Sequence, residues 1–383
     1  MRPLRLLYVA LDQTVPGTLG GSVHVQAVAE GLARLGHEVH VATGQGGPWP
    51  GRQVTWHRLT PPFGLRALRW ARRAAIARLA RSIRTDVVME RYYNFGGEGV
   101  LAARALGVPA VLEVNAPVVD YPGSPKAWLD RLLLVRPLAR WRNRLCRLTD
   151  LFVTPSAAIL PDWIERGRVL EIEWGADVEA FAPRPANERR AERASAIVCL
   201  FAGAFRVWHG APALARALAG RHEAGDTRFA GLFVGDGPER VATERAAAGV
   251  PRVTFAGRVP HANLPTLFAR ADIGVAPFDV RRHGPLALGF YWSPLKVFEY
   301  MAAGLPVVAP ALPRLTRLIE HGREGWLYDP DDPSGLERAL VALADPDLRG
   351  RLGAAARARA VNDYSWSAHC AALDARLRAL VGT

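Results

Sequence analysis

The stretch S-P-L-K-V-F-E-Y-M-A-A-G runs from Ser293 to Gly304, and the apolar run Leu305 to Ala309 follows it directly. Ser293 is a favourable N-cap, Pro294 suits the first helical position, and Gly304 stands where a left-handed residue would end a helix of three turns. The pattern therefore predicts a short capped helix that leads into a buried strand.

The first turn of this helix is predicted to bind an anion, because its backbone N–H groups lack helical partners and the helix dipole is positive there. Lys296 lies in that turn, and Glu299 follows on the same face. Lys296 is one of only two lysines, with Lys126, in a chain that has 49 Lys and Arg residues. The arrangement suits a nucleoside diphosphate, with phosphates on Lys296 and the ribose on Glu299. The alternative is a solvated Lys296–Glu299 surface pair.

Composition places the chain among globular proteins of two or three domains. It has 383 residues, of which 50% are hydrophobic and 22% charged. No apolar run approaches the roughly 18 residues of a membrane span, and residues 1–10 predict a strand better than a signal peptide. The three cysteines show no metal or redox spacing. We therefore expect a cytoplasmic location. Peripheral attachment to the inner face of the membrane is a further expectation.

The net charge of +13 is concentrated in the first part of the chain. Residues 1–150 hold 21 Lys and Arg against 10 Asp and Glu, which gives +11. Arg66–Arg84 and Lys126–Arg147 each contain seven basic residues, with Trp and Leu interleaved at helical spacing. Basic amphipathic helices of this kind are typical of membrane-surface binding. The alternative is ordinary covering helices, and no module signature supports nucleic-acid binding.

Short apolar runs alternate with helical patterns in both halves of the chain, which predicts an α/β fold of two doubly wound domains with a ligand cleft at the carboxyl ends of strands. The predicted domains are 1–185, completed by a helix at 365–383, and 186–364, with a linker at Phe181–Ser195. The expected helices include Val23–Leu35, Arg66–Arg84, Gly97–Leu106, Lys126–Leu148, Ala157–Arg166, Ala211–Ala219 and Leu264–Arg270. The expected strands include Leu4–Leu11, Glu38–Thr43, Asp86–Met89, Pro109–Val114, Leu151–Thr154, Ile197–Ala202, Phe229–Val234, Val253–Phe255, Ile273–Pro277 and Val307–Ala309.

A series of short motifs accompanies these elements in a characteristic order. They are Gly20-Gly21 before a helix, Leu35-Gly36-His37-Glu38-Val39, Trp174-Gly175-Ala176-Asp177, Phe201 to Arg206, Trp208-His209-Gly210, Gly235-Asp236-Gly237-Pro238, Phe255 to Val259, Ala271-Asp272 and the S-P-L-K block. Through them, the chain resembles the retaining glycosyltransferases of family 4, the group 1 set with the GT-B fold. The resemblance implies two Rossmann-like domains that face a central cleft.

The resemblance also implies a donor site in the second domain. Glu299 is similar to the second glutamate of the family's E-x7-E element, which binds the ribose, whereas the first glutamate falls at Tyr291 and is missing. Arg206 matches the arginine that neutralises the diphosphate, and His209 stands where relatives have a lysine. The turn Ser293, Leu295 and Lys296 would substitute for the missing glutamate. Gly20 and Gly21 would close over the donor phosphate, and Val259 belongs to the backbone segment that contacts the base.

On the acceptor side, the resemblance points to two residues that follow strands. Asn115 falls near the position of a histidine in many relatives, and since an amide is no base near neutral pH, its expected role is orientation or hydrogen bonding. Glu90 is expected to face the acceptor, with a structural ion pair as the alternative.

The expected reaction is transfer of a hexose, with retention, from a nucleoside-diphosphate sugar to a glycan or lipid-linked acceptor hydroxyl in envelope, exopolysaccharide or glycolipid synthesis. Arg206 and Lys296 would stabilise the departing diphosphate. Neither a metal nor another cofactor is expected, and an anionic membrane surface is a further expected partner. The alternatives are transfer to a soluble natural product, a pyridoxal-dependent phosphorylase, a nucleotide-sugar epimerase, and a retired transferase that acts as a membrane-surface binding partner.

Overall fold

A computed structural model describes residues 2–49, 53–94, 96–133, 136–183 and 196–382. The chain divides into two units. Unit 1 contains the chain up to Trp174, the short segment Tyr291–Ser293 and the C-terminal residues from Trp366, and unit 2 contains Gly175–Phe290 and Pro294–Ser365. The predicted boundary between residues 185 and 186, and most of the predicted linker, lie outside the described residues.

Unit 1 is built on a seven-stranded parallel sheet in the order β3-β2-β1-β4-β5-β6-β7. The strands are β1 Arg5–Val15, β2 Glu38–Gly46, β3 Val54–Arg58, β4 Val87–Arg91, β5 Ala110–Glu113, β6 Leu151–Thr154 and β7 Val169–Glu171. The inner strand β1 is buried continuously from Leu6 to Asp12, as expected for a parallel strand that is covered on both faces. The strand order reverses between β2 and β4, which identifies the doubly wound arrangement.

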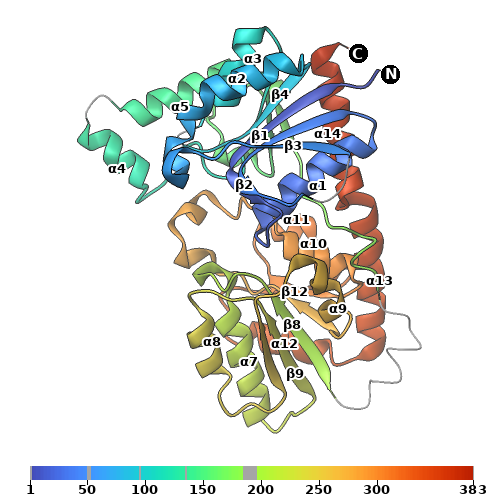
Figure 1. Cartoon of the computed structure of the whole chain (residues 1–383). Helices are drawn as coiled ribbons and strands as arrows, with labels where there is room; N and C mark the ends of the chain where they lie inside the picture. The colour runs from blue at the N-terminus through green and yellow to red at the C-terminus, as the bar shows by residue number, and fades with distance from the viewer. Residues whose placement is uncertain (1, 50–52, 95, 134–135, 184–195, 383) are drawn as a thin grey trace. The chain divides into compact units, whose positions relative to one another are not determined.

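Helices cover both faces of this sheet. They are α1 Gly20–Arg34, α2 Arg73–Ser82, α3 Glu98–Leu106, α4 Pro125–Leu132, α5 Pro137–Leu148 and α14 Trp366–Val381, and a 3-10 helix, η2 Arg66–Arg72, precedes α2. The C-terminal helix α14 packs beside α1, and α2, α3 and α5 lie on the other side of the sheet (Figure 1).

Three of the predicted helices differ in detail from the structure. Lys126–Leu148 is two helices, α4 and α5, because Arg136 adopts a left-handed conformation (φ 46°) and Pro137 can only begin a new helix. Arg66–Arg84 starts as the 3-10 helix η2. Ala157–Arg166 forms only the short 3-10 turns Ala157–Ile159 and Arg166–Arg168, since Pro161 lies between them.

Unit 2 has a six-stranded parallel sheet in the order β10-β9-β8-β11-β12-β13. The strands are β8 Ile197–Ala202, β9 Phe229–Val234, β10 Val253–Gly257, β11 Ile273–Val275, β12 Val307–Pro310 and β13 Gly325–Tyr328. Its helices are α7 Ala211–Glu223, α8 Arg240–Ala246, α9 Leu264–Phe268, α10 Leu295–Ala302, α11 Leu315–Leu318, α12 Gly335–Ala342 and α13 Pro346–Asp363.

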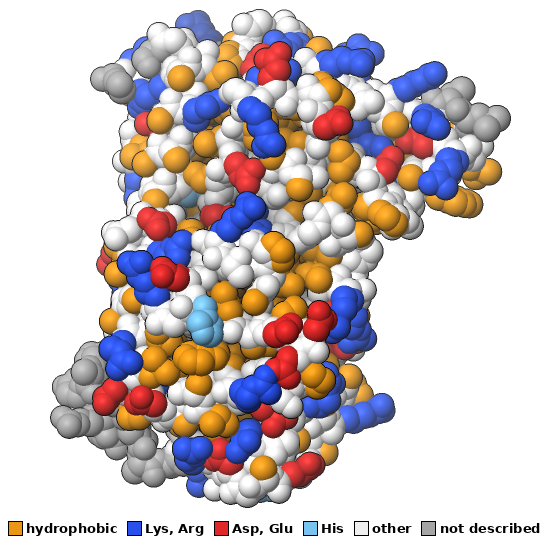
Figure 2. All heavy atoms as spheres, turned by 180° about the vertical axis from the view of Figure 1, so that it is seen from behind, with side chains coloured by type: hydrophobic (Ala, Val, Ile, Leu, Met, Phe, Trp, Pro, Cys, Tyr) orange, Lys and Arg blue, Asp and Glu red, His pale blue; other side chains and the backbone are white. Residues whose placement is uncertain are grey.

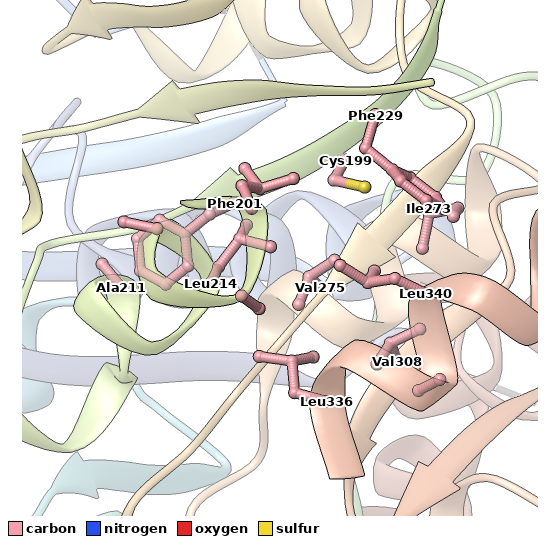
Figure 3. Close-up of a cluster of buried hydrophobic side chains, with 14 of the residues drawn as sticks. Cys199, Phe201, Ala211, Leu214, Phe229, Ile273, Val275, Val308, Leu336 and Leu340 are labelled. Carbon is pink, nitrogen blue, oxygen red and sulfur yellow. The ribbon is translucent and has the colours of Figure 1, made fainter. Parts of the chain in front are cut away.

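One face of the unit 2 sheet packs against α7 and α12. Phe201 from β8, Val275 from β11 and Val308 from β12 are fully buried, and they meet Leu214 of α7 and Leu340 of α12 (Figure 3). This core fixes β8 and β11, the strands whose carboxyl ends lead to the candidate site. No helix in the described part of the chain is both long enough and apolar enough to span a bilayer.

Candidate functional site

Helix α10 carries the central residues of the candidate site, but it is capped differently from the prediction. It has eight residues, about two turns, and Pro294 rather than Ser293 occupies the N-cap position. The Ser293 hydroxyl instead accepts a hydrogen bond from the Trp174 N–H (2.7 Å) and donates one to Glu173 (2.8 Å), both within unit 1. The prediction of Ser293 as N-cap was therefore wrong, because these unit 1 partners engage its side chain.

The C-terminal end of α10 forms as predicted. Gly304 is left-handed (φ 68°), its N–H donates to Met301 O (2.9 Å), and the N–H of Leu305 donates to Tyr300 O (3.0 Å). This pair of bonds is the Schellman motif. At the other end, none of the hydrogen bonds found in the described residues engages the N–H groups of Leu295 and Lys296. Those two groups are therefore free to bind a ligand.

The Lys296 ammonium is buried within unit 2 and is not part of a surface pair. Its Nζ has no solvent access and, among the described residues, no hydrogen-bond partner; it lies 4.3 Å from the ring centroid of Phe201 and 5.4 Å from that of Phe278. Glu299 is only 4% exposed, so the alternative of a solvated Lys296–Glu299 pair is wrong. Burial lowers the pKa of Lys296 to about 7, although the nearby Glu299 charge opposes this shift.

Two side chains, those of Lys296 and His209, converge on the turn that follows β8. A Cβ atom at Gly203 would lie 2.7 Å from Lys296 Nζ and 3.3 Å from His209 Nδ1. Burial, and then the charges of Lys296 and Arg206, lower the pKa of His209 well below its usual value, so its imidazole is neutral near pH 7. The Arg206 side chain is exposed, with its guanidinium 5.7 Å from the ring centroid of Trp208. His209 and Lys296, predicted from separate motifs, thus meet at this turn, and Arg206 lies near enough for its charge to act on His209.

The turn itself is held tightly against its neighbour. Gly235 has φ 119°, and a Cβ there would lie 1.9 Å from the carbonyl oxygen of Gly203. Only glycine fits at such a position. Because Lys296 Nζ lies directly behind Gly203, a ligand can reach the ammonium only if the lysine side chain or this turn shifts.

Glu299 has a partner that the sequence analysis did not identify. His261 Nε2 donates to Glu299 Oε1 over 2.6 Å, and this bond ties the segment after β10 to α10. The same segment contains the half-buried Val259, which follows the left-handed Gly257 (φ 67°). The predicted base-contacting segment and the predicted ribose-binding carboxylate are therefore neighbours.

The glycine pair of unit 1 begins a helix and is not a loop. Gly20 and Gly21 are the first residues of α1, and neither has a positive φ. A Cβ at Gly21 would lie 2.6 Å from Gln13 Oε1 and 3.3 Å from the Arg91 guanidinium. The expected loop conformation is therefore absent, and the contact of this pair with the donor phosphate stays a prediction.

Asn115 belongs to a dense polar cluster at the carboxyl end of β5. Its amide donates to Glu113, and its carbonyl accepts from the Trp174 indole N–H (3.1 Å). Tyr8 and Arg91 also donate to Glu113, and His24 Nε2 lies 3.0 Å from it. Burial opposes ionisation of Glu113, but these donors keep its pKa well below the usual range. Asn115 thus hydrogen-bonds within unit 1, and its orienting role toward an acceptor stays a prediction. In the sequence, the signal for Glu113 was a charged residue at the end of an apolar strand.

Glu90 has the structural role that was the alternative to acceptor binding. It is 1% exposed, and its carboxylate accepts from the N–H groups of Gly97 (2.6 Å), Gly99 (2.8 Å) and Val100 (3.0 Å) at the start of α3. The fully buried Arg69 contacts Glu90, Asp12 and Glu98. Nothing in the spacing of the arginine-rich segment distinguishes Arg69 from its exposed neighbours.

In the ranges that the structure describes, no group of three His, Cys, Asp or Glu side chains could hold a metal ion.

Two family models match the chain. Residues 19–173 match the model for Glycosyltransferase Family 4, and residues 196–345 match the model for Glycosyl transferases group 1. The chain belongs to the family 4 glycosyltransferases. The sequence-based recognition of the family is therefore confirmed.

The relatives of this family 4 glycosyltransferase differ in length and specificity. It is 30% identical over 286 residues to the sulfoquinovosyl transferase SQD2 of Arabidopsis thaliana, which covers 70% of this chain and 52% of that enzyme. It is 28% identical over 397 residues to a GDP-mannose-dependent alpha-mannosyltransferase of Mycobacterium tuberculosis, which covers 98% of this chain and 96% of that enzyme. The chain spans 52–66% of the length of three of its curated relatives, SQD2 included.

The fold agrees with a solved structure of the same kind. The crystal structure of Anabaena Alr3699/HepE in complex with UDP-glucose superposes with a TM-score of 0.72 at 18% identity, covering 98% of this chain and 100% of that one. The predicted GT-B fold, with its two Rossmann-like units, is thereby confirmed.

Proposed function

We propose that this protein transfers a hexose from a nucleoside-diphosphate sugar to an acceptor hydroxyl, with retention at the anomeric carbon. The observation that carries the proposal is the meeting of His209 and Lys296 at Gly203, with the charge of Arg206 acting on His209, in the same unit as the free N–H groups of α10 and Glu299. The HepE structures with UDP and UDP-glucose, and the GDP-mannose dependence of the mycobacterial relative, support a nucleotide-sugar donor.

The residues act mainly on the leaving group. As the bond between the anomeric carbon and the phosphate oxygen breaks, the electron pair stays on the diphosphate. Once the Lys296 side chain or the Gly203 turn has shifted so that the ammonium is reached, Arg206, Lys296 and the N–H groups of Leu295 and Lys296 would stabilise that charge. The acceptor oxygen would attack the same face of the sugar and give its proton to the departing phosphate oxygen. The proposal includes no metal or other cofactor, because these groups supply the positive charge themselves.

A screen of nucleotide sugars tests this function. We expect one donor, at about 100 times its dissociation constant, to stabilise the protein by about 2.7 kcal/mol and so raise its melting temperature by several degrees. The corresponding free hexose, which lacks the diphosphate, should have no effect. If no nucleoside diphosphate or nucleotide sugar shifts the melting temperature, the transferase proposal fails and the retired membrane-binding alternative is favoured.

We further propose that the acceptor is lipid-linked or a membrane-surface glycan, and that unit 1 binds the cytoplasmic face of an anionic membrane. Phe63, Trp70, Trp128 and Leu132 are 92%, 60%, 65% and 63% exposed, and they lie in or beside the two arginine-rich segments. Figure 2 shows Lys and Arg side chains interspersed with hydrophobic ones over the part of unit 1 that carries α4 and α5. Exposed aromatic side chains beside arginines suit an anionic bilayer surface.

Liposome flotation tests the membrane proposal. We expect binding to vesicles that contain anionic lipid, weakened by high salt, and a loss of about tenfold in the double variant Trp70→Ser, Trp128→Ser. Val241→Ser, which removes a 56% exposed apolar side chain from α8 in unit 2, is the matched control and should leave binding unchanged. Absence of binding at low salt would end the membrane proposal and favour a soluble acceptor.

A further inference from the structure

We propose that His261 is a positioning residue for donor recognition, which holds the Glu299 carboxylate in the orientation that binds the ribose hydroxyls. This inference rests on the proposed function, since it concerns how the same site reads the sugar of the nucleotide. His261 does not belong to any of the motifs that predicted the site.

The contact is short, largely enclosed and formed within unit 2. Glu299 is 4% exposed, and His261 Nε2 lies 2.6 Å from its Oε1. Among the described residues, no other side chain or backbone group hydrogen-bonds to the Glu299 carboxylate. Oε2 is therefore left without a protein donor, whereas Oε1 is fixed. A carboxylate held by one oxygen presents the other in a defined direction to a ligand hydroxyl.

Packing restricts the imidazole as well. The ring of His261 lies against that of Phe181, with centroids 5.6 Å apart, and Phe181 in turn packs edge-on against Phe268 of α9 at 5.0 Å. Helix α9 contacts α10 through Phe268 and Tyr300, whose centroids are 5.4 Å apart (Figure 1). His261 is thus braced by the same aromatic layer that supports the helix carrying Glu299.

The charges around His261 favour its hydrogen bond with Glu299. Burial alone would lower the pKa of His261, but the hydrogen bond and charge of Glu299, together with Asp177, raise it above the usual value. Lys296, one turn earlier on α10, and Tyr300 are further ionisable groups near Glu299. In the neutral imidazole, Nε2–H still donates to Oε1, so the orientation of Glu299 does not depend on protonation of His261.

The proposed role of His261 affects how well the protein distinguishes ribose nucleotides from deoxyribose nucleotides. If His261 only stabilised the fold, its removal would weaken every nucleotide equally. If it orients Glu299, its removal costs affinity only for nucleotides that carry the hydroxyls Glu299 accepts from. The ratio of affinities for ribose and deoxyribose nucleotides therefore separates the two roles.

The experiment compares UDP and GDP with their 2′-deoxy and 3′-deoxy counterparts by titration calorimetry on the full-length protein. For the wild type, we expect the better-bound ribonucleotide to be preferred by about tenfold over at least one deoxy form. His261→Ala should reduce that preference to about twofold and leave affinity for the deoxy form unchanged. His261→Gln, whose amide N–H can replace Nε2–H, should retain most of the preference.

The outcomes separate this inference from the function on which it rests. If the wild type discriminates and His261→Ala keeps the full preference, the positioning role is refuted while the donor site stands. An equal loss of both nucleotides in His261→Ala also refutes it, since that indicates a structural role. If the wild type binds neither UDP nor GDP, the proposed function fails first, and the inference falls with it.

Discussion

Replacing Lys296 with methionine is expected to weaken nucleoside-diphosphate binding by roughly 1.5–3 kcal/mol while making the folded protein more stable by roughly 1–3 kcal/mol. The two effects have one cause. Lys296 Nζ is buried against Phe201 and Phe278 without a hydrogen-bond partner among the described residues. The free protein therefore holds a desolvated amine that the ligand would satisfy. Calorimetric titration and urea unfolding measure the two free energies separately.

The pH dependence of this variant has a defined sign. The pKa of Lys296 is about 7 in the folded protein, against about 10.4 in an unfolded chain. Between these values the folded state binds fewer protons than the unfolded state, so wild-type stability rises with pH. The stability gained by Lys296→Met should thus be largest at pH 7 and shrink towards pH 9.5. Diphosphate binding should take up a proton above pH 7, which is detected as a buffer-dependent binding enthalpy that is absent in the variant.

The only other lysine provides a matched control. Lys126 Nζ also has a pKa lowered by burial, to about 8, but it donates to Pro117 O over 2.6 Å in unit 1. Lys126→Met should therefore give no gain in stability and no change in nucleotide affinity. Unchanged nucleotide affinity in Lys296→Met would contradict the role of Lys296 in the donor site.

The elements that the sequence predicted well are those fixed by local chemistry. Gly304 ends α10 because a left-handed residue is needed there, and glycine takes that conformation without strain. The apolar runs became central strands because such runs are buried on both faces of a parallel sheet. His209 and Lys296 were found through motifs, and the structure brings both to Gly203.

The features that the sequence did not predict depend on contacts between distant segments. Ser293 has the composition of an N-cap, yet Glu173 and Trp174 engage its hydroxyl from 119 to 120 positions away in sequence. His261 is 38 positions from Glu299, and no local pattern links them. Tyr291, where the family has its first glutamate, is 2% exposed and belongs to unit 1. The partners of Ser293 and of His261 become neighbours only when the sheets assemble.

Arg69 is a further residue whose role the sequence did not predict. Its replacement is expected to have the largest effect on stability. Its guanidinium is fully buried and contacts three carboxylates, those of Asp12, Glu90 and Glu98. Through Glu90, which caps the start of α3, the cluster connects η2 to β1, β4 and α3. Among the described residues, Arg69 is the only cation in contact with all three carboxylates. Its removal leaves Asp12 with Arg91, but leaves Glu90 and Glu98 without the guanidinium that they share.

Arg69→Met is therefore expected to destabilise unit 1 by roughly 3–5 kcal/mol near pH 8, measured by urea unfolding. Burial and the neighbouring Glu98 raise the pKa of Glu90 to about 7 even with Arg69 present. Loss of the guanidinium should raise it further. A carboxyl whose pKa is raised on folding binds more protons folded than unfolded, so its contribution to stability falls as pH rises. The loss in Arg69→Met should thus be smaller at pH 5 than at pH 8.

The exposed Arg73, at the start of α2, is the matched control, because Arg73→Met removes the same side chain from the same basic segment. It should change stability by no more than about 0.5 kcal/mol at either pH. If Arg69→Met and Arg73→Met behave alike, the buried cluster does not hold the arginine-rich segment to the sheet. If only Arg69→Met shows the pH-dependent loss, one arginine of this segment fixes the fold while its exposed neighbours remain available to a membrane or an acceptor.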